Sequence, residues 1–305
     1  MKVAVGFSGG VDSTVLLFAC RAAGVPVTAI HINHGLHASA DAWEANCRER
    51  CAAWRIPFIA RRVSVTRQGG ESLEAEARTA RYTALAQVMG ECAATILLTG
   101  HHQDDQLETS LLALLRGSGL AGLAGMQPVA AWPLHGATYK NLHIVRPLLT
   151  LSKAAILRFA ATQGLSTIDD PSNADPALRR NALRIQILPL IETAFPQYRA
   201  SLTRLARQVG ELRNEWQAEA AAVLPTVLDP DERLRIHDWL ALPTAVRLRV
   251  LRAWLATRTI RLSEAQTFEL ARQLAAGTGG ERRIGGRCRL HIRRGRAGLY
   301  WPADE

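Results

Sequence analysis

Two short stretches of this 305-residue chain combine residue types that bind phosphate with residue types that move protons. The first reads Ser8-Gly9-Gly10-Val11-Asp12-Ser13 and lies between an apolar segment and a helix-length segment. Its glycines allow backbone N–H groups to approach an oxyanion, and its serine hydroxyls can donate hydrogen bonds to phosphate oxygens. Asp12 could hold a magnesium ion that bridges those oxygens. The stretch predicts a phosphate site, although a plain strand-to-helix turn would also favour an acid there.

The second stretch reads Gly100-His101-His102-Gln103-Asp104-Asp105-Gln106-Leu107-Glu108-Thr109. Leucines at positions 107, 111, 114 and 115 predict a helix, so Asp105 and Glu108 share one of its faces. A pair of carboxylates can bind an ammonium group, and a carboxylate or His101 can act as a general base. Acids also complement the dipole at a helix N-terminus, but this density of acids and histidines exceeds what capping requires. We therefore predict a functional site here.

Strands and helices must bring these two stretches together. Apolar segments predict strands that begin at residue 3 and that cover residues 27–32, 57–63, 93–99 and 143–145. Helix-length segments alternate with the strands, which is typical of a parallel sheet in an α/β domain. Each polar stretch directly follows a strand. We therefore expect both at the carboxyl edge of the sheet, where open α/β folds bind ligands.

The later part of the chain is predicted to be mostly helical. One long helix is expected from Tyr198 to about Val223, followed by helices over residues 230–241, 244–258 and 263–275. The tail from Glu281 to Tyr300 is rich in arginine and interrupted by glycines. It contains two stretches in which polar and apolar residues alternate, a pattern that predicts a β-hairpin. We expect a catalytic domain over residues 1–200, a connecting helix over 201–222 and a basic domain over 223–305.

Charge is uneven along the chain, whose net charge is +10. Residues 171–305 hold 22 basic against 14 acidic residues, whereas residues 1–170 are close to neutral. A basic half suggests a polyanion partner, with nucleic acid the leading candidate, although a solvated arginine-rich surface has the same composition. No apolar run approaches the ~20 residues that cross a membrane, and the five cysteines suggest no disulfide framework. The N-terminal apolar stretch is interrupted by the polar turn and does not read as a signal peptide, so we expect a cytoplasmic protein with no membrane partner.

The combination of segments resembles the tRNA(Ile)-lysidine synthetase family of N-type ATP pyrophosphatases, also called PP-loop proteins. The matching segments run through nearly all of residues 1–200 and are Ser8–Ser13, His31–Leu36, Glu74–Tyr82, Gly100–Thr109, Arg116–Met126 and Asp170–Arg184. His37 departs from the family, in which arginine is the commoner residue. The last third matches less well, and the chain resembles a short form without the family's further C-terminal domain.

The resemblance implies a fold, a reaction and a set of site residues. The fold is a parallel-sheet α/β domain of the adenine nucleotide alpha hydrolase type, followed by a smaller, mostly helical basic domain. ATP would adenylate O2 of the first anticodon cytidine of tRNA(Ile) with a CAU anticodon, and free L-lysine would then attack C2. The implied ATP-binding residues are Ser8, Gly9, Gly10, Val11, Asp12 and Ser13, with magnesium on Asp12. The implied catalytic residues are Asp12, Arg81, His101, Asp105 and Glu108, of which Asp105 and Glu108 also bind lysine. The candidate tRNA-binding residues are Arg180, Arg184, Arg204 and Arg207.

Other functions remain open at this point. A nucleotide-responsive RNA-binding module without catalysis would explain the charge but not the pair Asp105 and Glu108. Another PP-loop tRNA-modifying enzyme, or a ligase that adenylates a small molecule, would use the same first stretch; a small acceptor would leave the basic half unexplained. The oligomeric state is also open, with a homodimer among the alternatives.

Overall fold

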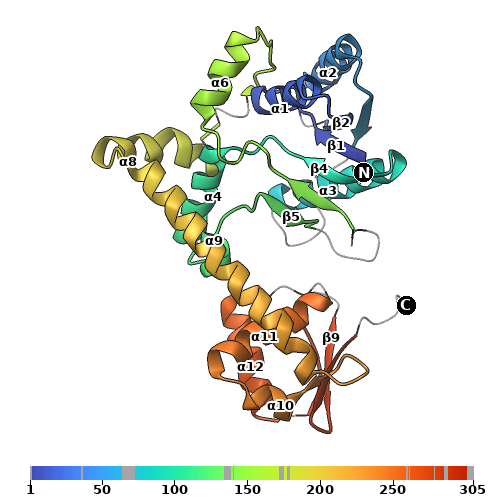
Figure 1. Ribbon diagram of the computed structural model, residues 1–305, viewed down its shortest axis with the longest axis vertical. Helices are drawn as coiled ribbons and strands as arrows, with labels where there is room; N and C mark the ends of the chain where they lie inside the picture. Colours follow the sequence, from blue (N-terminus) through green and yellow to red (C-terminus); the bar gives the residue numbers. More distant parts are fainter. Residues whose placement is uncertain are drawn as a thin grey trace. The chain divides into compact units, whose positions relative to one another are not determined.

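The computed structural model describes residues 2–35, 37–63, 73–133, 139, 141–171, 175–176, 179–258, 260, 262–277, 279–284 and 288–300. Leu36 of the His31–Leu36 segment and residues 172–174 and 177–178 of the Asp170–Arg184 segment lie outside the described residues, as does the side chain of Glu74. The chain forms two compact units, which are described separately (Figure 1). The first unit contains residues 1–113 and 125–206, and the second contains residues 114–124 and 207–305.

The first unit is built on a six-stranded sheet. Its strands are β1 (Lys2–Gly6), β2 (Val27–Asn33), β3 (Phe58–Arg62), β4 (Ala94–Leu98), β5 (Val129–Ala131) and β6 (His143–Val145). They lie in the order β3-β2-β1-β4-β6-β5, and all neighbours are parallel except the edge pair β5 and β6. The mostly parallel α/β sheet is therefore confirmed. The short antiparallel strand β5 was not predicted.

Helices cover both faces of this sheet (Figure 1). One face carries α1 (Val11–Ala22), α2 (Ala40–Trp54) and α6 (Lys153–Thr162), and the other carries α3 (Leu73–Glu91). The alternation of side chains along β1 shows why, because Val5 packs with the first group and Ala4 with α3. The two cores hold the sheet rigid beneath the loops that leave its carboxyl edge.

The remaining helices of the first unit lie next to the second polar stretch. They are α4 (Gln103–Leu115), α7 (Arg179–Ala182), the π-helical turn η3 (Leu183–Ile187), α8 (Leu188–Ala194) and the start of α9 (Tyr198–Val223). A small core of Leu183, Leu188 and Tyr198 packs against Leu111 and Leu112 of α4. This packing places the arginines of α7 and η3 beside the acids of α4.

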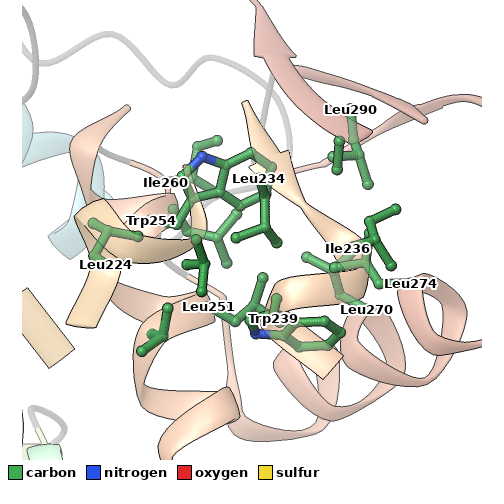
Figure 2. Close-up of a cluster of buried hydrophobic side chains, with 14 of the residues drawn as sticks. Leu224, Leu234, Ile236, Trp239, Leu251, Trp254, Ile260, Leu270, Leu274 and Leu290 are labelled. Atoms are coloured by element: carbon green, nitrogen blue, oxygen red, sulfur yellow. The ribbon is translucent and has the colours of Figure 1, made fainter. Parts of the chain in front are cut away.

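The second unit joins helices to a four-stranded antiparallel sheet. Besides the later part of α9, it contains α5 (Leu120–Leu123), η4 (Leu224–Val227), α10 (Ile236–Ala241), α11 (Thr244–Thr257), α12 (Glu264–Ala275) and strands β7 (Leu234–Arg235), β8 (Gly280–Arg283), β9 (Arg289–Arg293) and β10 (Arg296–Tyr300). Trp239 and Trp254 fill the centre of its apolar core, together with leucines from the helices and sheet (Figure 2). The strands lie in the order β7-β10-β9-β8.

Two local expectations in the second unit were incomplete. The expected hairpin is part of this four-stranded sheet, and the helix expected over residues 230–241 begins only at Ile236. The cause is a tight turn at Asp229, whose carboxylate accepts hydrogen bonds from the backbone N–H groups of Asp231 and Arg233 at 3.0 and 2.9 Å. This turn directs Leu234 into β7, where it is fully buried. No helix among the described residues is long and apolar enough to cross a membrane.

Candidate active site

The first polar stretch forms a compact loop between β1 and α1. The backbone N–H of Ser8 donates to Ser13 Oγ at 3.2 Å, and the two serine hydroxyl oxygens lie 3.1 Å apart. The hydroxyls of Ser13 and Thr14 donate to the carbonyl oxygens of Gly10 and Gly9 at 3.0 and 3.1 Å. These bonds curl the loop around the N-terminus of α1, where unsatisfied backbone N–H groups attract an anion.

Two glycines make this loop sterically feasible. Gly9 has φ +84°, and a Cβ atom there would lie 2.4 Å from Ile168 Cδ1 and 2.9 Å from Cys47 Sγ. At the end of β4, a Cβ atom on Gly100 would lie 2.9 Å from the carbonyl carbon of Asp12. A side chain at position 100 would separate the second polar stretch from the first, and one at position 9 would push the loop away from Ile168 and Cys47.

Asp12 is held by a lysine that sequence reasoning missed. The Nζ atom of Lys153 lies 2.7 Å from Asp12 Oδ1 and 2.9 Å from Oδ2. Lys153 is the first residue of α6, where Ser152 is the N-cap. Its backbone N–H donates to Asp104 Oδ2 at 2.8 Å. No sequence signal pointed from Lys153 to Asp12, because 141 residues separate them.

His102 lies at the centre of the acids. Its imidazole is buried, with Nε2 3.4 Å from Asp105 Oδ2 and 3.7 Å from Asp12 Oδ1. Its Nδ1 lies 3.8 Å from Asp104 Oδ2. Its backbone N–H donates to Asp105 Oδ2 at 3.0 Å. The structure therefore joins the two polar stretches through His102, whereas the sequence drew attention to His101.

His101 is a neutral imidazole at physiological pH. Burial lowers its pKa to about 4, with Asp105 opposing the shift. The charges that add to the lowering belong to Arg146, Arg180 and Arg81. Its Nδ1 lies 2.8 Å from Thr99 Oγ1. A neutral imidazole can accept a proton, as a general base must.

Glu108 does not present a free carboxylate. The side chain is fully buried, and Arg184 approaches it with Nε at 2.7 Å from Oε1 and Nη2 at 3.1 Å from Oε2. Arg180 Nε lies 3.0 Å from Oε2, and Arg180 Nη2 donates to Thr109 Oγ1 at 2.8 Å. The structure thus brings Arg180 and Arg184 to the predicted lysine site. Asp105, whose side chain is 16% exposed, is the more accessible acid.

The other predicted arginines occupy different surroundings. Arg81 is exposed, and its guanidinium carbon lies 5.6 Å from the centre of the Tyr82 ring. Arg204 and Arg207 are exposed on α9, and Arg207 pairs with Glu211 at 2.6 Å. These contacts leave the proposed roles of all three untested.

Arg146 is a second residue that sequence reasoning missed. It directly follows β6 at the carboxyl edge, is buried, and donates from Nη1 to the carbonyl oxygen of Gln127 at 2.7 Å. Its Nε has no hydrogen-bond partner among the described residues. The only signal in the sequence was an arginine placed at the end of a predicted strand.

The histidine segment at the end of β2 makes hydrogen bonds within the protein. His31 is buried, its Nδ1 lies 2.9 Å from the carbonyl oxygen of Phe7, and burial lowers its pKa. The side-chain amide of Asn33 donates to Asp41 and Glu44 at 2.9 and 3.1 Å. His37 stacks on Trp43 with ring centres 4.8 Å apart. The described part of the chain contains no group of three or more histidine, cysteine or acidic residues that could hold a metal ion.

A mostly parallel sheet with a serine- and glycine-rich loop at its carboxyl edge defines the class of PP-loop nucleotide-binding proteins. Residues 1–191 match the family model of the PP-loop domain, and residues 234–300 match that of the TilS substrate binding domain. A tRNA(Ile)-lysidine synthase from Xanthomonas campestris pv. campestris (strain 8004) is 37% identical over 314 residues, which cover 99% of this chain and 70% of the relative. The chain belongs to the tRNA(Ile)-lysidine synthase family.

Two further comparisons set the limits of the likeness. The tRNA(Ile)-lysidine synthase of Xylella fastidiosa (strain 9a5c) is 44% identical over 260 residues, which cover 84% of this chain but 57% of the relative. The chain therefore spans little more than half the length of that relative. The solved structure of the U34-tRNA thiolase NcsA from Methanococcus maripaludis, with its 4Fe-4S cluster, superposes with a TM-score of 0.57 at 20% identity. This match covers 69% of this chain and 72% of the thiolase, and it supports the fold alone.

Proposed function

We propose that the protein is a tRNA(Ile)-lysidine synthase that acts in the cytoplasm. It would use ATP to join lysine to C2 of the first anticodon cytidine of tRNA(Ile) with a CAU anticodon, releasing AMP and pyrophosphate. The observation that carries the proposal is the meeting of the Ser8–Ser13 loop with His102, which directly precedes α4, and with the acids of α4 at one sheet edge. A phosphate site and a site for an amine nucleophile must be neighbours in such a reaction.

ATP would bind with its phosphates on the Ser8–Ser13 loop. The backbone N–H groups at the N-terminus of α1 and the hydroxyl of Ser8 would supply donors for phosphate oxygens, and the Ser13 hydroxyl would join them by turning away from the Gly10 carbonyl oxygen. Magnesium, which neutralises phosphate charge when bound, typically takes one or two protein carboxylates and completes its shell with phosphate and water oxygens. Asp12 is the carboxylate that would take this role, because it lies beside the loop and its side chain is 30% exposed; Lys153, which pairs with both of its oxygens, would then share it with the metal ion.

The first chemical step would be adenylation of the RNA. O2 of the cytidine attacks the α-phosphorus of ATP, and the bond to the bridging oxygen of the β-phosphate breaks, so that pyrophosphate leaves with the electron pair. The protein contributes positioning and positive charge, which are the main requirements of phosphoryl-type transfer. Arg81 and Arg180, whose charges act on His101, are the candidates for stabilising the α-phosphate.

In the second step the ε-amine of lysine would attack C2 of the cytidine, so that a C2–N bond forms, the C2–O2 bond breaks and AMP leaves with O2 and the electron pair. Asp105 would hold one ammonium group of free lysine through a charge-assisted hydrogen bond. The attacking ε-amine must lose a proton, and the neutral imidazole of His101 can accept it. Glu108 would act on this site mainly through Arg180 and Arg184, whose guanidinium groups it fixes.

The tRNA would be held mainly by the second unit, from about residue 223 onward, with residues 201–222 as the connection to a catalytic domain over 1–200. In the pairing of β9 with β10, Arg293 lies opposite Arg296, and Arg289 lies opposite Tyr300. All four side chains are exposed on the face of the sheet away from the core. A hollow of about 550 Å³ opens there, lined by Asp231, Glu232, Arg233, Arg258, His291, Arg293, Arg294, Arg296, Gly298, Leu299 and Tyr300. Its arginines suit an RNA backbone, and the rings of His291 and Tyr300 suit unstacked bases.

The test is incubation of the protein with labelled lysine, ATP and tRNA(Ile) bearing a CAU anticodon. We expect label in the RNA and AMP in equal amounts, with little label in methionine tRNA that has the same anticodon. ATP consumption without lysine transfer would favour another PP-loop reaction. Binding of ATP and RNA without any turnover would favour a non-catalytic module.

A further inference from the structure

Lys153 places its ammonium group beside the Ser8–Ser13 loop, through its contact with Asp12. Two of the three N–H donors of an ammonium group are accounted for by the two oxygens of Asp12, at 2.7 and 2.9 Å. Among the described residues the third N–H has no partner, so it remains for a ligand, and 36% of the side chain is exposed. Asp12 is the second residue of α1, so the Lys153 ammonium group lies beside the Ser8–Ser13 loop and the N-terminus of α1.

A purely structural role accounts poorly for this lysine. It is the first residue of α6, where the helix dipole disfavours a positive charge. Its ion pair with Asp12 is partly exposed, and such pairs contribute little to stability. Only three of the 37 basic residues of the chain are lysine, so arginine is the default cation of this sequence. Position 153 nevertheless carries lysine, whose ammonium group is a compact point charge.

The root of the side chain is also fixed. Ser152 Oγ accepts a hydrogen bond from Ala155 N at 3.2 Å and sets the start of α6. Asp104 Oδ2 accepts the backbone N–H of Lys153 at 2.8 Å, while Arg199 binds Asp104 Oδ1. These bonds hold the backbone in place and leave the ammonium group free to adjust by side-chain rotation.

We propose that Lys153 is a phosphate-binding residue of the ATP site and that it stabilises the pyrophosphate leaving group. This inference rests on the proposed function. When the bond between the α-phosphorus and the bridging oxygen breaks, negative charge grows on pyrophosphate, and an N–H of Lys153 donates to one of its oxygens. Lys153, on α6, would thus contact the phosphates as the lysine of a Walker loop does, although it comes from a different segment of the chain than the phosphate loop.

The test compares Lys153→Met, which keeps length and removes charge, with Lys153→Arg and with Lys2→Met as the matched control. Lys2 is an exposed lysine at the start of β1. Binding of the α,β-methylene analogue of ATP and of AMP is measured by calorimetry, and pyrophosphate release is measured with tRNA present. Loss of one charge-assisted hydrogen bond should weaken analogue binding about 10-fold and slow pyrophosphate release about 100-fold. AMP affinity should not change, Lys153→Arg should recover part of the loss, and Lys2→Met should match the wild type.

Equal analogue affinity and equal pyrophosphate release in Lys153→Met and wild type would overturn the proposal. A second comparison, in the Asp12→Asn background, separates phosphate binding from neutralisation of Asp12. There Lys153→Met should still weaken analogue binding, whereas a lysine that only neutralises Asp12 would have no further effect. Thermal unfolding of each variant identifies a folding defect. If Lys153→Met is poorly folded, the comparison of Lys153→Arg with the wild type is used instead, and recovery of analogue binding by the arginine supports the proposal. If the wild type itself fails to prefer the ATP analogue over AMP, the proposed function fails first, and that result is distinct from a failure of Lys153 alone.

Discussion

Arg184 binds both carboxylate oxygens of the buried Glu108, with Nε 2.7 Å from Oε1 and Nη2 3.1 Å from Oε2. Parallel hydrogen bonds of this kind fix orientation as well as charge, and the hydrogen bonds to Glu108 raise the pKa of Arg184. Arg180 approaches the same carboxylate at 3.0 Å. Two candidate tRNA-binding arginines are therefore organised by an acid that the sequence suggested for lysine binding.

The first prediction separates the two acids of α4. Glu108→Gln leaves two guanidinium groups beside a buried amide, so we expect a loss of about 1–3 kcal/mol in the free energy of unfolding. Asp105→Asn keeps an oxygen that can accept the His102 N–H, so we expect a loss below about 1 kcal/mol and a large rise in KM for lysine. Urea unfolding and lysine-transfer kinetics measure the two effects. Equal stability losses, with no separate lysine defect for Asp105→Asn, would contradict this assignment.

The second prediction concerns the bond of ATP that breaks. Asp12→Ala removes the carboxylate at the loop, and we expect AMP formation to fall by at least ~100-fold, which corresponds to about 2.7 kcal/mol in the barrier. Chromatography of labelled nucleotides gives the products directly. Formation of ADP and phosphate by the wild-type protein would show that the loop has been assigned to the wrong chemistry.

Most of the site's scaffold could be predicted from local sequence, because its signals lie within a few residues of one another. The Ser8–Ser13 turn is confirmed as local structure, and the long helix Tyr198–Val223 has the predicted bounds. Lys153 and Arg146 could not be assigned, because their partners are set by which strands and helices become neighbours in the fold. No local pattern encodes that adjacency.

The segment Leu114–Ala124 is a second case. It overlaps the Arg116–Met126 segment that carries part of the family resemblance, and its packing places it in the second unit together with residues 207–305. A chain segment that leaves one unit and joins another carries no composition signal of its own. For the same reason β7, with only two residues, could not be separated from the helix that follows it.

The third prediction tests the need for glycine in the phosphate loop. Gly9→Ala meets both a positive φ and Ile168 Cδ1 at 2.4 Å, whereas Gly24→Ala, at φ +66°, meets nothing within 4 Å. The strain of the left-handed conformation is common to both, about 1–2 kcal/mol, and the clash should add about 1–3 kcal/mol at Gly9 only. Urea unfolding of the two variants gives the difference. Equal destabilisation would mean that the Ile168 side chain moves aside without lowering the free energy of unfolding.

The fourth prediction concerns protonation of His101, whose pKa burial lowers to about 4. The unfolded chain takes up a proton near pH 6.5, whereas the folded chain does so only near pH 4, so this group's contribution to stability is lost as pH falls between those values. NMR of histidine labelled with carbon-13, with His101→Gln used for assignment, should show a neutral imidazole at about pH 5.5. An ordinary titration near pH 6.5 would remove the argument for His101 as a neutral base in the free protein.

The last prediction concerns the basic face of the C-terminal sheet. Arg293 and Arg294 lie at the turn between β9 and β10, where Arg294 and Gly295 both have positive φ, and neither arginine has an acidic partner within the described ranges. Unpaired cations of this kind are free to bind phosphates. The double variant Arg293→Ala/Arg294→Ala should therefore weaken tRNA binding and flatten its salt dependence, by about one unit of slope for each phosphate that the variant no longer neutralises. The control is Arg48→Ala on α2, which removes an exposed charge from the first unit. Arg48 pairs with Glu44 in the wild type. Filter binding over a range of salt concentrations gives both slopes. If the double variant keeps the wild-type slope while Arg48→Ala changes it, tRNA is held by another surface of the protein.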